Sequence, residues 1–289
     1  MNSRLDVALV TCRRLPEPDP DARPLSEALA AAGIRHAVRA WDDETVDWSR
    51  ARLTLLRSCW NYPRHASRFL AWAGSVARVS RLLNPFRTVR WNLHKGYLLE
   101  LRRRGVPTVP TQLVERGTRA SLVEILRRHG WERAVVKPAI SAASLETILV
   151  TPDVVEEGQR HLERLTQRGD VLVQPYLESV EGYGERAVVM IEGKVTHAVR
   201  KNPRFSGQDE RVSDEAVPIA PAEEEVALRA SRAAGGPFLY ARADLAPGPD
   251  GEPLVMELEL IEPSLFFRQG PAALESLVAG LRRRLEGLV

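Results

Sequence analysis

Short apolar segments alternate with amphipathic helical segments through the first third of the chain, and this pattern restricts the fold more than any other feature. Strands are expected at residues 5–11, 34–40 and 52–58, and helices at 22–32 and 64–81. Strands that alternate with helices form parallel sheets, so the pattern predicts a small parallel α/β lobe that ends near Asn84 and Pro85. No G-x-G-x-x-G follows the first strand, which argues against a dinucleotide-binding domain.

The remaining two thirds of the chain predict an α+β organisation. Helices are expected at 92–104, 121–128, 153–168, 221–234 and 271–287, and strands at 111–115, 134–137, 147–150, 171–174, 185–192, 194–200, 238–245 and 253–260. The strands 185–192 and 194–200 have the pattern of a hairpin, and the charged segment 202–214 is predicted to be a mobile loop. The predicted architecture is α/β (α+β) with three lobes, at residues 1–88, 89–175 and 176–289.

Composition excludes several classes of protein. An apolar fraction of 44% and a charged fraction of 27% over 289 residues are typical of a globular protein. Acidic residues interrupt the basic ones almost everywhere, so the net charge of +3 predicts no nucleic-acid partner. No apolar run is long enough to span a membrane, and none resembles a secretory signal. The two cysteines form no metal or disulfide pattern, so a cytoplasmic location is predicted.

Lysine is rare in this chain, since only four of its 41 basic residues are lysines. Lys137 ends an apolar strand, and the small residues Ser141, Ala142, Ala143 and Ser144 follow it closely. Small side chains allow backbone N–H groups to approach phosphate oxygens, and a nearby ammonium group offsets their charge. The pattern therefore favours a phosphate site, although an ordinary strand end followed by a turn has the same appearance.

Four carboxylates near the end of the chain form the strongest local pattern: Asp244, Glu257, Glu259 and Glu262. Residues 240–245 and 254–260 are predicted to be adjacent strands, and the i, i+2 spacing places Glu257 and Glu259 on one face. Carboxylates on one face repel each other unless a cation lies between them, and oxygen ligands without His or Cys suit Mg²⁺. A solvent-facing acidic strand is the alternative interpretation.

Taken together, these motifs resemble the ATP-grasp superfamily, in particular its glutathione-synthetase-like branch. The motifs occur in order at residues 91–95, 136–138, 174–177, 184–185, 242–244 and 256–259. Within the superfamily, residues 56–63, 141–144, 196–199 and 257–265 are similar to a bacterial group that includes the D-cycloserine-forming cyclo-ligase. The resemblance implies an ATP-grasp fold, in which the second and third lobes hold the nucleotide between them.

The resemblance also implies roles for individual residues of this sequence. Nucleotide binding is expected from Lys95, Lys137, Ser141, Ala142, Ala143, Ser144, Gln174, Pro175, Tyr176, Leu177, Glu181 and Glu185. The metal ligands are expected to be Asp244, Glu257 and Glu259, and the groups that stabilise the transferred phosphoryl group are expected to be Arg242, Arg211 and Lys201. Substrate binding is expected from Arg57, Trp60, Tyr62, Glu262 and Ser264.

The activity implied is that of a carboxylate–amine ligase that uses ATP and Mg²⁺ and acts through an acyl phosphate on a small amino-acid-like molecule. Two alternatives remain: an intramolecular cyclo-ligase, and a nucleotide-binding protein with little turnover. Relatives in the superfamily are often dimers or tetramers, so a homodimer or homotetramer is expected. The chain departs from the family pattern in three places. Glu259 stands where many members have Asn, Leu145 and Glu146 stand where glycine is common, and residues 202–214 fit the family loop only loosely.

Overall fold

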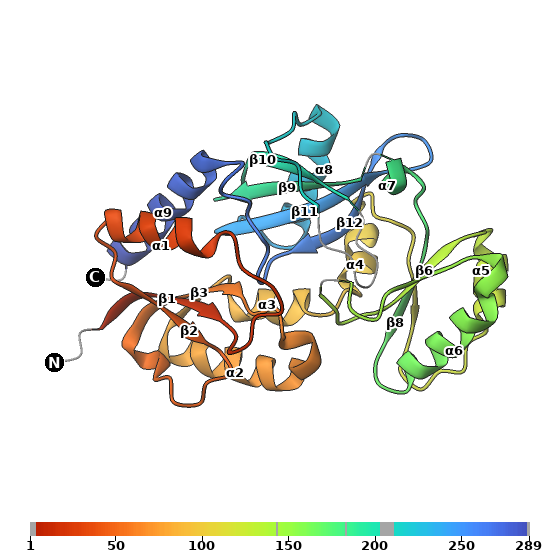
Figure 1. Cartoon of the computed structure of the whole chain (residues 1–289), viewed down its shortest axis with the longest axis horizontal. Helices are drawn as coiled ribbons and strands as arrows, with labels where there is room; N and C mark the ends of the chain where they lie inside the picture. Colours follow the sequence, from red (N-terminus) through yellow and green to blue (C-terminus); the bar gives the residue numbers. More distant parts are fainter. Residues whose placement is uncertain (1–3, 143, 183, 203–210, 288–289) are drawn as a thin grey trace.

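The first third of the chain folds as the predicted parallel α/β lobe. The computed structural model describes residues 4–142, 144–182, 184–202 and 211–287 (Figure 1). The elements of this lobe are β1 (Leu5–Thr11), α1 (Ala22–Ala31), β2 (His36–Ala40), β3 (Ala51–Ser58), α2 (Ala66–Val79) and β4 (Arg81–Leu83). The strands pair in the order β2-β1-β3-β4, all parallel. Alternate side chains of β1 enter two different cores, since Val7 packs with α1 and Val10 packs with α2.

The second sheet is antiparallel and has the order β5-β8-β6-β7. Its elements are β5 (Gln112–Val114), α5 (Leu122–His129), β6 (Ala134–Pro138), β7 (Ile148–Val150), α6 (Val155–Thr166) and β8 (Val171–Pro175). Local signals set the bounds of α5, because Ser121 caps its first turn and Gly130 ends it with a positive φ of 65°. The helices α5 and α6 pack on one face of this sheet through Leu122 and Leu162.

The third sheet is also antiparallel and has the order β10-β9-β11-β12. Its strands are β9 (Glu185–Ile191), β10 (Lys194–Lys201), β11 (Tyr240–Pro247) and β12 (Pro253–Glu259), and its helices are α8 (Pro221–Ala233) and α9 (Pro271–Glu286). Val188 of β9 packs with α8, whereas Val189 packs on the opposite face with α9. Figure 1 shows α9 beside α1, so the last helix of the chain joins the first and third lobes.

The single helix predicted over residues 92–104 is wrong. The segment instead forms α3 (Phe86–Asn92) and α4 (Tyr97–Arg103), with a non-helical turn over residues 93–96. The turn allows the Lys95 N–H to donate to the Ala139 carbonyl at 2.7 Å, a bond between distant segments of the second lobe that a continuous helix would not permit. Gly96 was the only local sign of this interruption in the sequence.

Three smaller differences also separate the predicted and observed elements. The predicted helix 64–81 ends at Val79, and residues 81–83 form β4 because they pair with β3. The short helix α7 (Ser179–Gly182) was not predicted. Within the predicted loop 202–214, residues 203–210 lie outside the described residues, and Val212 forms a bridge with Lys201. The domain boundaries at residues 88 and 175 stay a prediction, although each sheet lies within one predicted lobe.

A carboxylate at the start of α1 fixes the segment that precedes α9. Asp21 accepts hydrogen bonds from the backbone N–H groups of residues 265–267 at 2.5, 3.2 and 2.9 Å. Arg57 lies 3.5 Å from this carboxylate and donates to the Pro263 carbonyl at 2.9 Å. The clamp is almost completely buried, so it holds residues 263–267 against the first lobe.

In the described part of the chain, no helix is long and apolar enough to cross a membrane.

We expect Asp21→Asn to lower the free energy of unfolding by about 3 kcal/mol, because the change leaves the Arg57 guanidinium buried without a carboxylate. Equilibrium unfolding in urea measures this change. Glu44→Gln is the matched control, since the Glu44 side chain is 87% exposed and its ion pair contributes about 0.5 kcal/mol or less. Equal losses in the two variants would contradict the role given to the clamp.

Candidate active site

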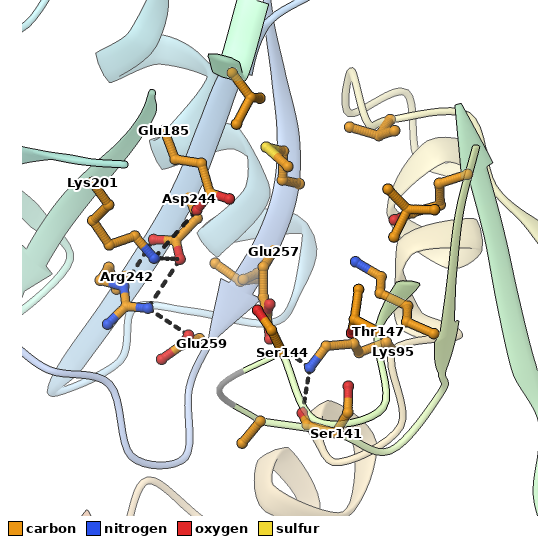
Figure 2. A pocket seen from close by; sticks show the side chains of 18 of the residues that line it. Lys95, Ser141, Ser144, Thr147, Glu185, Lys201, Arg242, Asp244, Glu257 and Glu259 are labelled. Carbon is orange, nitrogen blue, oxygen red and sulfur yellow. Dashed lines mark hydrogen bonds and ion pairs between the residues drawn. The ribbon is translucent and has the colours of Figure 1, made fainter. Parts of the chain in front are cut away.

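A cavity lies between the second and third sheets and receives side chains from both of them and from the first lobe. Lysine and arginine side chains that line it are Lys95, Lys137, Lys201 and Arg242, and carboxylates that line it are Glu17, Glu185, Asp244, Glu257, Glu259 and Glu262. Figure 2 shows Lys95 and Thr147 on the side of the second sheet, facing Asp244 and Glu257 on the third. The cavity therefore brings cations and carboxylates from distant parts of the chain together.

Asp244 is the most tightly held carboxylate of the cavity. Arg242 binds it through two nitrogens at 2.8 and 2.9 Å, and the Lys201 ammonium donates to it at 2.6 Å. Arg242 also contacts Glu259 at 2.5 Å, and Lys201 lies 3.3 Å from Glu185. Burial of Asp244 opposes its ionisation, but the charges of Arg242 and Lys201 outweigh burial and lower its pKa to about 2. Asp244 is therefore an anion at neutral pH.

Two lysines face the same strands from the other side of the cavity. The Lys95 ammonium contacts Glu257 at 2.6 Å and donates to the Ser141 carbonyl at 2.6 Å. No hydrogen bond or ion pair within the described residues holds the half-buried Lys137 ammonium. Burial and the Lys95 charge lower the pKa of Lys137, and Glu257 opposes them. The Lys137 ammonium therefore has no partner among the described residues, which suits an anionic ligand.

The predicted strand pairing is confirmed. Asp244 lies opposite Glu257, and Arg242 lies opposite Glu259, so both glutamates share the face that bears Asp244. Among the described residues, no three His, Cys, Asp or Glu side chains come close enough to hold a metal ion. The oxygen-only donor set fits Mg²⁺, but the structure pairs Asp244, Glu257 and Glu259 with Arg242, Lys201 and Lys95 instead.

The small-residue loop after Lys137 is anchored at its end by Glu146. Its carboxylate forms ion pairs with Arg164 at 3.0 Å and Arg168 at 2.6 Å, and its carbonyl accepts a hydrogen bond from His161 at 2.8 Å. The φ of Glu146 is 53°, a left-handed conformation that glycine adopts most easily. Glu146 therefore takes the backbone conformation that the family glycine would favour, and α6 holds it there.

Several residues predicted to bind ligands lie away from the cavity. Arg57 belongs to the buried Asp21 clamp, so its position does not fit the predicted contact with a substrate. Arg211 is exposed and does not line the cavity. Glu181 also lies outside the cavity lining and is paired with Arg133 at 2.8 Å. Ala143 lies outside the described residues.

Other predicted residues do meet at the cavity. These are Lys95, Lys137, Ser141, Ala142, Ser144, Gln174, Pro175, Tyr176, Leu177, Glu185, Lys201, Arg242, Asp244, Glu257, Glu259, Trp60, Tyr62, Glu262 and Ser264. The segment expected to bind adenine already uses some of its polar groups within the protein. The Tyr176 N–H donates to the Arg133 carbonyl at 2.9 Å. Gln174 is also engaged, since it donates to Thr111 at 2.8 Å.

Among the described residues that line the cavity, sequence reasoning missed four polar ones: Glu17, Asn92, Thr147 and Asn202. Glu17 lies in the loop after β1, and loops at the carboxyl ends of parallel strands often carry ligand sites, so this signal was available. Asn92 had no comparable signal. Its side chain donates to the Leu258 carbonyl at 2.7 Å and accepts from the Leu260 N–H at 2.8 Å, and it thereby holds β12 and the residues after it against α3.

Comparisons with known proteins agree with this geometry. Residues 7–84 match the family model of the D-cycloserine synthetase DcsG, N-terminal domain. The cycloserine biosynthesis protein DcsG of Streptomyces lavendulae is 36% identical over 265 residues, which cover 86% of this chain and 88% of that protein. The crystal structure of the D-cycloserine synthetase DcsG superposes with a TM-score of 0.90 at 34% identity, covering 96% of this chain and 99% of that chain.

More distant solved structures share the fold. The ATP-grasp ligase PsnB, complexed with a precursor peptide and AMPPNP, has a TM-score of 0.66 at 18% identity, with 99% of both chains covered. A D-alanine–D-alanine ligase from Bacillus anthracis, complexed with ATP, has a TM-score of 0.70 at 14% identity, with 99% of this chain and 100% of that chain covered. The predicted ATP-grasp fold is thus confirmed.

We expect Glu146→Gly to weaken ATP binding about three- to ten-fold, because ordering the loop would then oppose binding. The two arginines of the anchor are more than half exposed, so each ion pair contributes only about 0.2–1 kcal/mol. Calorimetric titration with ATP measures the affinity, and limited proteolysis of the unliganded protein should cut residues 141–147 faster in the variant. Glu215→Gly is the control, because Glu215 is exposed and lies outside the helices and strands. An unchanged ATP affinity in Glu146→Gly would show that the anchor does not order the loop.

Proposed function

The chain belongs to the D-cycloserine synthetase family of ATP-grasp ligases, and on that premise we propose that it closes a ring within one amino-acid-like molecule. As a member of this family it is an ATP-dependent ligase that forms a carbon–nitrogen bond. The sequence left intermolecular and intramolecular ligation open. Similarity to DcsG over most of both chains favours the intramolecular reaction, in which the carboxyl group and the amine belong to the same substrate.

One observation carries the proposal: four cations from different segments line the same cavity as the carboxylates of β11 and β12. Lys95 and Lys137 approach from the second lobe, whereas Lys201 and Arg242 belong to the third sheet. A triphosphate placed between them would exchange carboxylate partners for phosphate oxygens, which are strong acceptors for ammonium and guanidinium groups. The Lys137 ammonium, which has no partner among the described residues, would gain an ion pair in this way.

In the proposed reaction, a substrate carboxylate oxygen forms a bond to the γ-phosphorus, and the bond from that phosphorus to the β-phosphate oxygen breaks. The products of this step are an acyl phosphate and ADP. An amine nitrogen of the same molecule then bonds to the acyl carbon, the carbon–oxygen bond to phosphate breaks, and the nitrogen loses a proton. Lys201 and Arg242 would stabilise the charge on the transferred phosphoryl oxygens, because both lie beside Asp244 on the cavity wall.

The donor chemistry of the third sheet supports Mg²⁺ binding by Asp244 and Glu257, with Glu259 as a further ligand. The pKa values support this choice. Lys95 and Lys137 overcome burial and lower the pKa of Glu257, whereas burial raises the pKa of Glu259 to about 7. When bound, Mg²⁺ would neutralise phosphate charge. Lys95, Lys201 and Arg242, which pair with these carboxylates in the structure, would then be available to bind the phosphates of ATP.

A protein with little turnover is less well supported than an active ligase. That alternative rests on Glu146, which replaces a glycine common in the family, and on the loose fit of residues 202–214. Glu146 has a glycine-like φ and two ion pairs that hold it, whereas residues 203–210 lie outside the described residues. We also propose a cytoplasmic location, which fits the two buried free thiols of Cys12 and Cys59.

The direct test is ADP release by the purified full chain with Mg-ATP and a panel of D- and L-amino acids and their ureido and hydroxamate derivatives. Ring closure predicts ADP release with a single substrate and, by mass spectrometry, a product that has lost the mass expected for cyclisation. ADP release that requires a separate amine would replace ring closure with intermolecular ligation. No substrate-dependent ADP release from any member of the panel would count against the proposed function.

We expect Lys137→Ala to weaken ATP binding about 10- to 100-fold, because the change removes a charged hydrogen-bond donor from the phosphate site. Calorimetric titration with ATP and Mg²⁺ measures the loss. Lys194→Ala is the matched control, since Lys194 is an exposed lysine at the tip of the β9–β10 hairpin, and it should bind ATP as the wild type does. Undiminished ATP affinity in Lys137→Ala would rule out its phosphate role.

A further inference from the structure

Glu262 is a buried carboxylate that the protein does not pair with a cation. Only 7% of the residue is exposed, and it lines the cavity beside Trp60 and Tyr62. The Tyr62 side chain lies close enough to the Glu262 carboxyl group to favour its charged form, and Trp60 donates to the Glu262 backbone carbonyl at 3.2 Å. No lysine or arginine among the described residues forms an ion pair with Glu262.

A buried carboxylate without a cation is costly, because removal from water disfavours the charged form and one hydroxyl group compensates only part of that loss. Burial, together with the charge of Glu259, raises the pKa of Glu262 to about 8, and Lys95 opposes this shift only in part. A group maintained at such a cost in an open cavity is suited to a ligand that brings the missing positive charge.

The neighbours of Glu262 favour a cationic ligand group as well. Glu17 and Glu259 line the same cavity, whereas Arg57 of the first lobe is held by Asp21 and does not line it. The aromatic side chain of Trp60 is half-buried in the cavity lining, and aromatic faces attract cations. The lining around Glu262 therefore offers carboxylates and aromatic rings to a cationic group.

We propose that Glu262 binds the ammonium group of the substrate, so that the enzyme selects amino acids with a free amine over simple carboxylic acids. The inference rests on the proposed function, because it assigns the substrate class of that same site. Binding at Glu262 would also orient the substrate. Arg242 donates at 3.2 Å to the carbonyl of Ser264, which lies two residues after Glu262 in the chain. An ammonium group at Glu262 would therefore place the neighbouring carboxyl group toward Arg242 and the site of phosphoryl transfer.

The test is calorimetric titration of the full chain, saturated with Mg-ADP, using three matched pairs of probes. Each pair differs by one amine: D-alanine and propionate, D-serine and 3-hydroxypropionate, and D-cycloserine and 1,2-oxazolidin-3-one. We expect at least one amine-bearing probe to bind the wild type about ten-fold or more tightly than its partner, the ratio typical of a charge-assisted hydrogen bond. In Glu262→Gln this ratio should fall to near one, while the affinity for Mg-ADP stays unchanged.

Two further variants separate the carboxylate from general effects. Glu262→Asp keeps the charge on a shorter side chain and should retain part of the preference for the amine. Glu27→Gln, at an exposed position on α1, should retain all of it. Equal binding of each pair by the wild type, the absence of binding by every amine-bearing probe, or a preference that persists in Glu262→Gln would each overturn the inference.

The variant Glu262→Gln is expected to fold. Because the pKa of Glu262 is raised from 4.5 to about 8 in the folded protein, its favourable contribution is complete below pH 4.5 and is lost as the pH rises through about 8. A neutral glutamine has no such loss, so the variant should be at least as stable as the wild type at pH 8. Substrate-dependent ADP release is measured separately: amine selection through Glu262 without ADP release would leave the inference standing and reject the ligase activity.

Discussion

The packing of carboxylates on β11 and β12 is the constraint on which the rest of the candidate site depends. Asp244, Glu257 and Glu259 share one face of two adjacent strands, and such a face is stable only if positive charge reaches it. In the structure that charge comes from Arg242 on the same sheet, from Lys201 on β10 and from Lys95, which lies beyond the sheet on the turn between α3 and α4. Electrostatic pairing between Lys95 and Glu257 thus links the second and third lobes.

The backbone around the cavity shows the cost of holding these groups in place. Glu146 and Phe266 both have left-handed φ values, near 50°, which disfavour residues other than glycine by about 1 kcal/mol or more. Each is held by bonds from elsewhere in the chain: Arg164 of α6 and Arg168 just after it bind the Glu146 carboxylate, and Asp21 at the start of α1 accepts from the Phe266 N–H. The same Asp21 clamp precedes α9, which packs against α1, so the docking of the first lobe and the position of the Glu262 segment depend on one carboxylate.

The features that could be predicted from the sequence are those set by short-range periodicity. The i, i+2 spacing of Glu257 and Glu259 placed both on one face, and the alternation of strands and helices gave the parallel first lobe. Features set by contacts between segments distant in the sequence were not predictable in this way. The predicted helix 92–104 failed because the Lys95 N–H bonds to the distant Ala139 carbonyl, and Arg57 was assigned to the substrate because nothing in its neighbourhood indicates Asp21, which lies 36 residues earlier.

Charge also explains why one cavity suits both an anionic nucleotide and a zwitterionic substrate. Among the described residues, the Lys137 ammonium has no partner and Glu262 has no cation, so the same cavity offers an unpaired group of each sign. A molecule with an ammonium group beside its carboxyl group could bind Glu262 and direct the carboxyl group toward Arg242. Binding in that orientation would remove the cost of a buried, unpaired carboxylate, and the two unpaired groups would then orient the substrate as well as bind it.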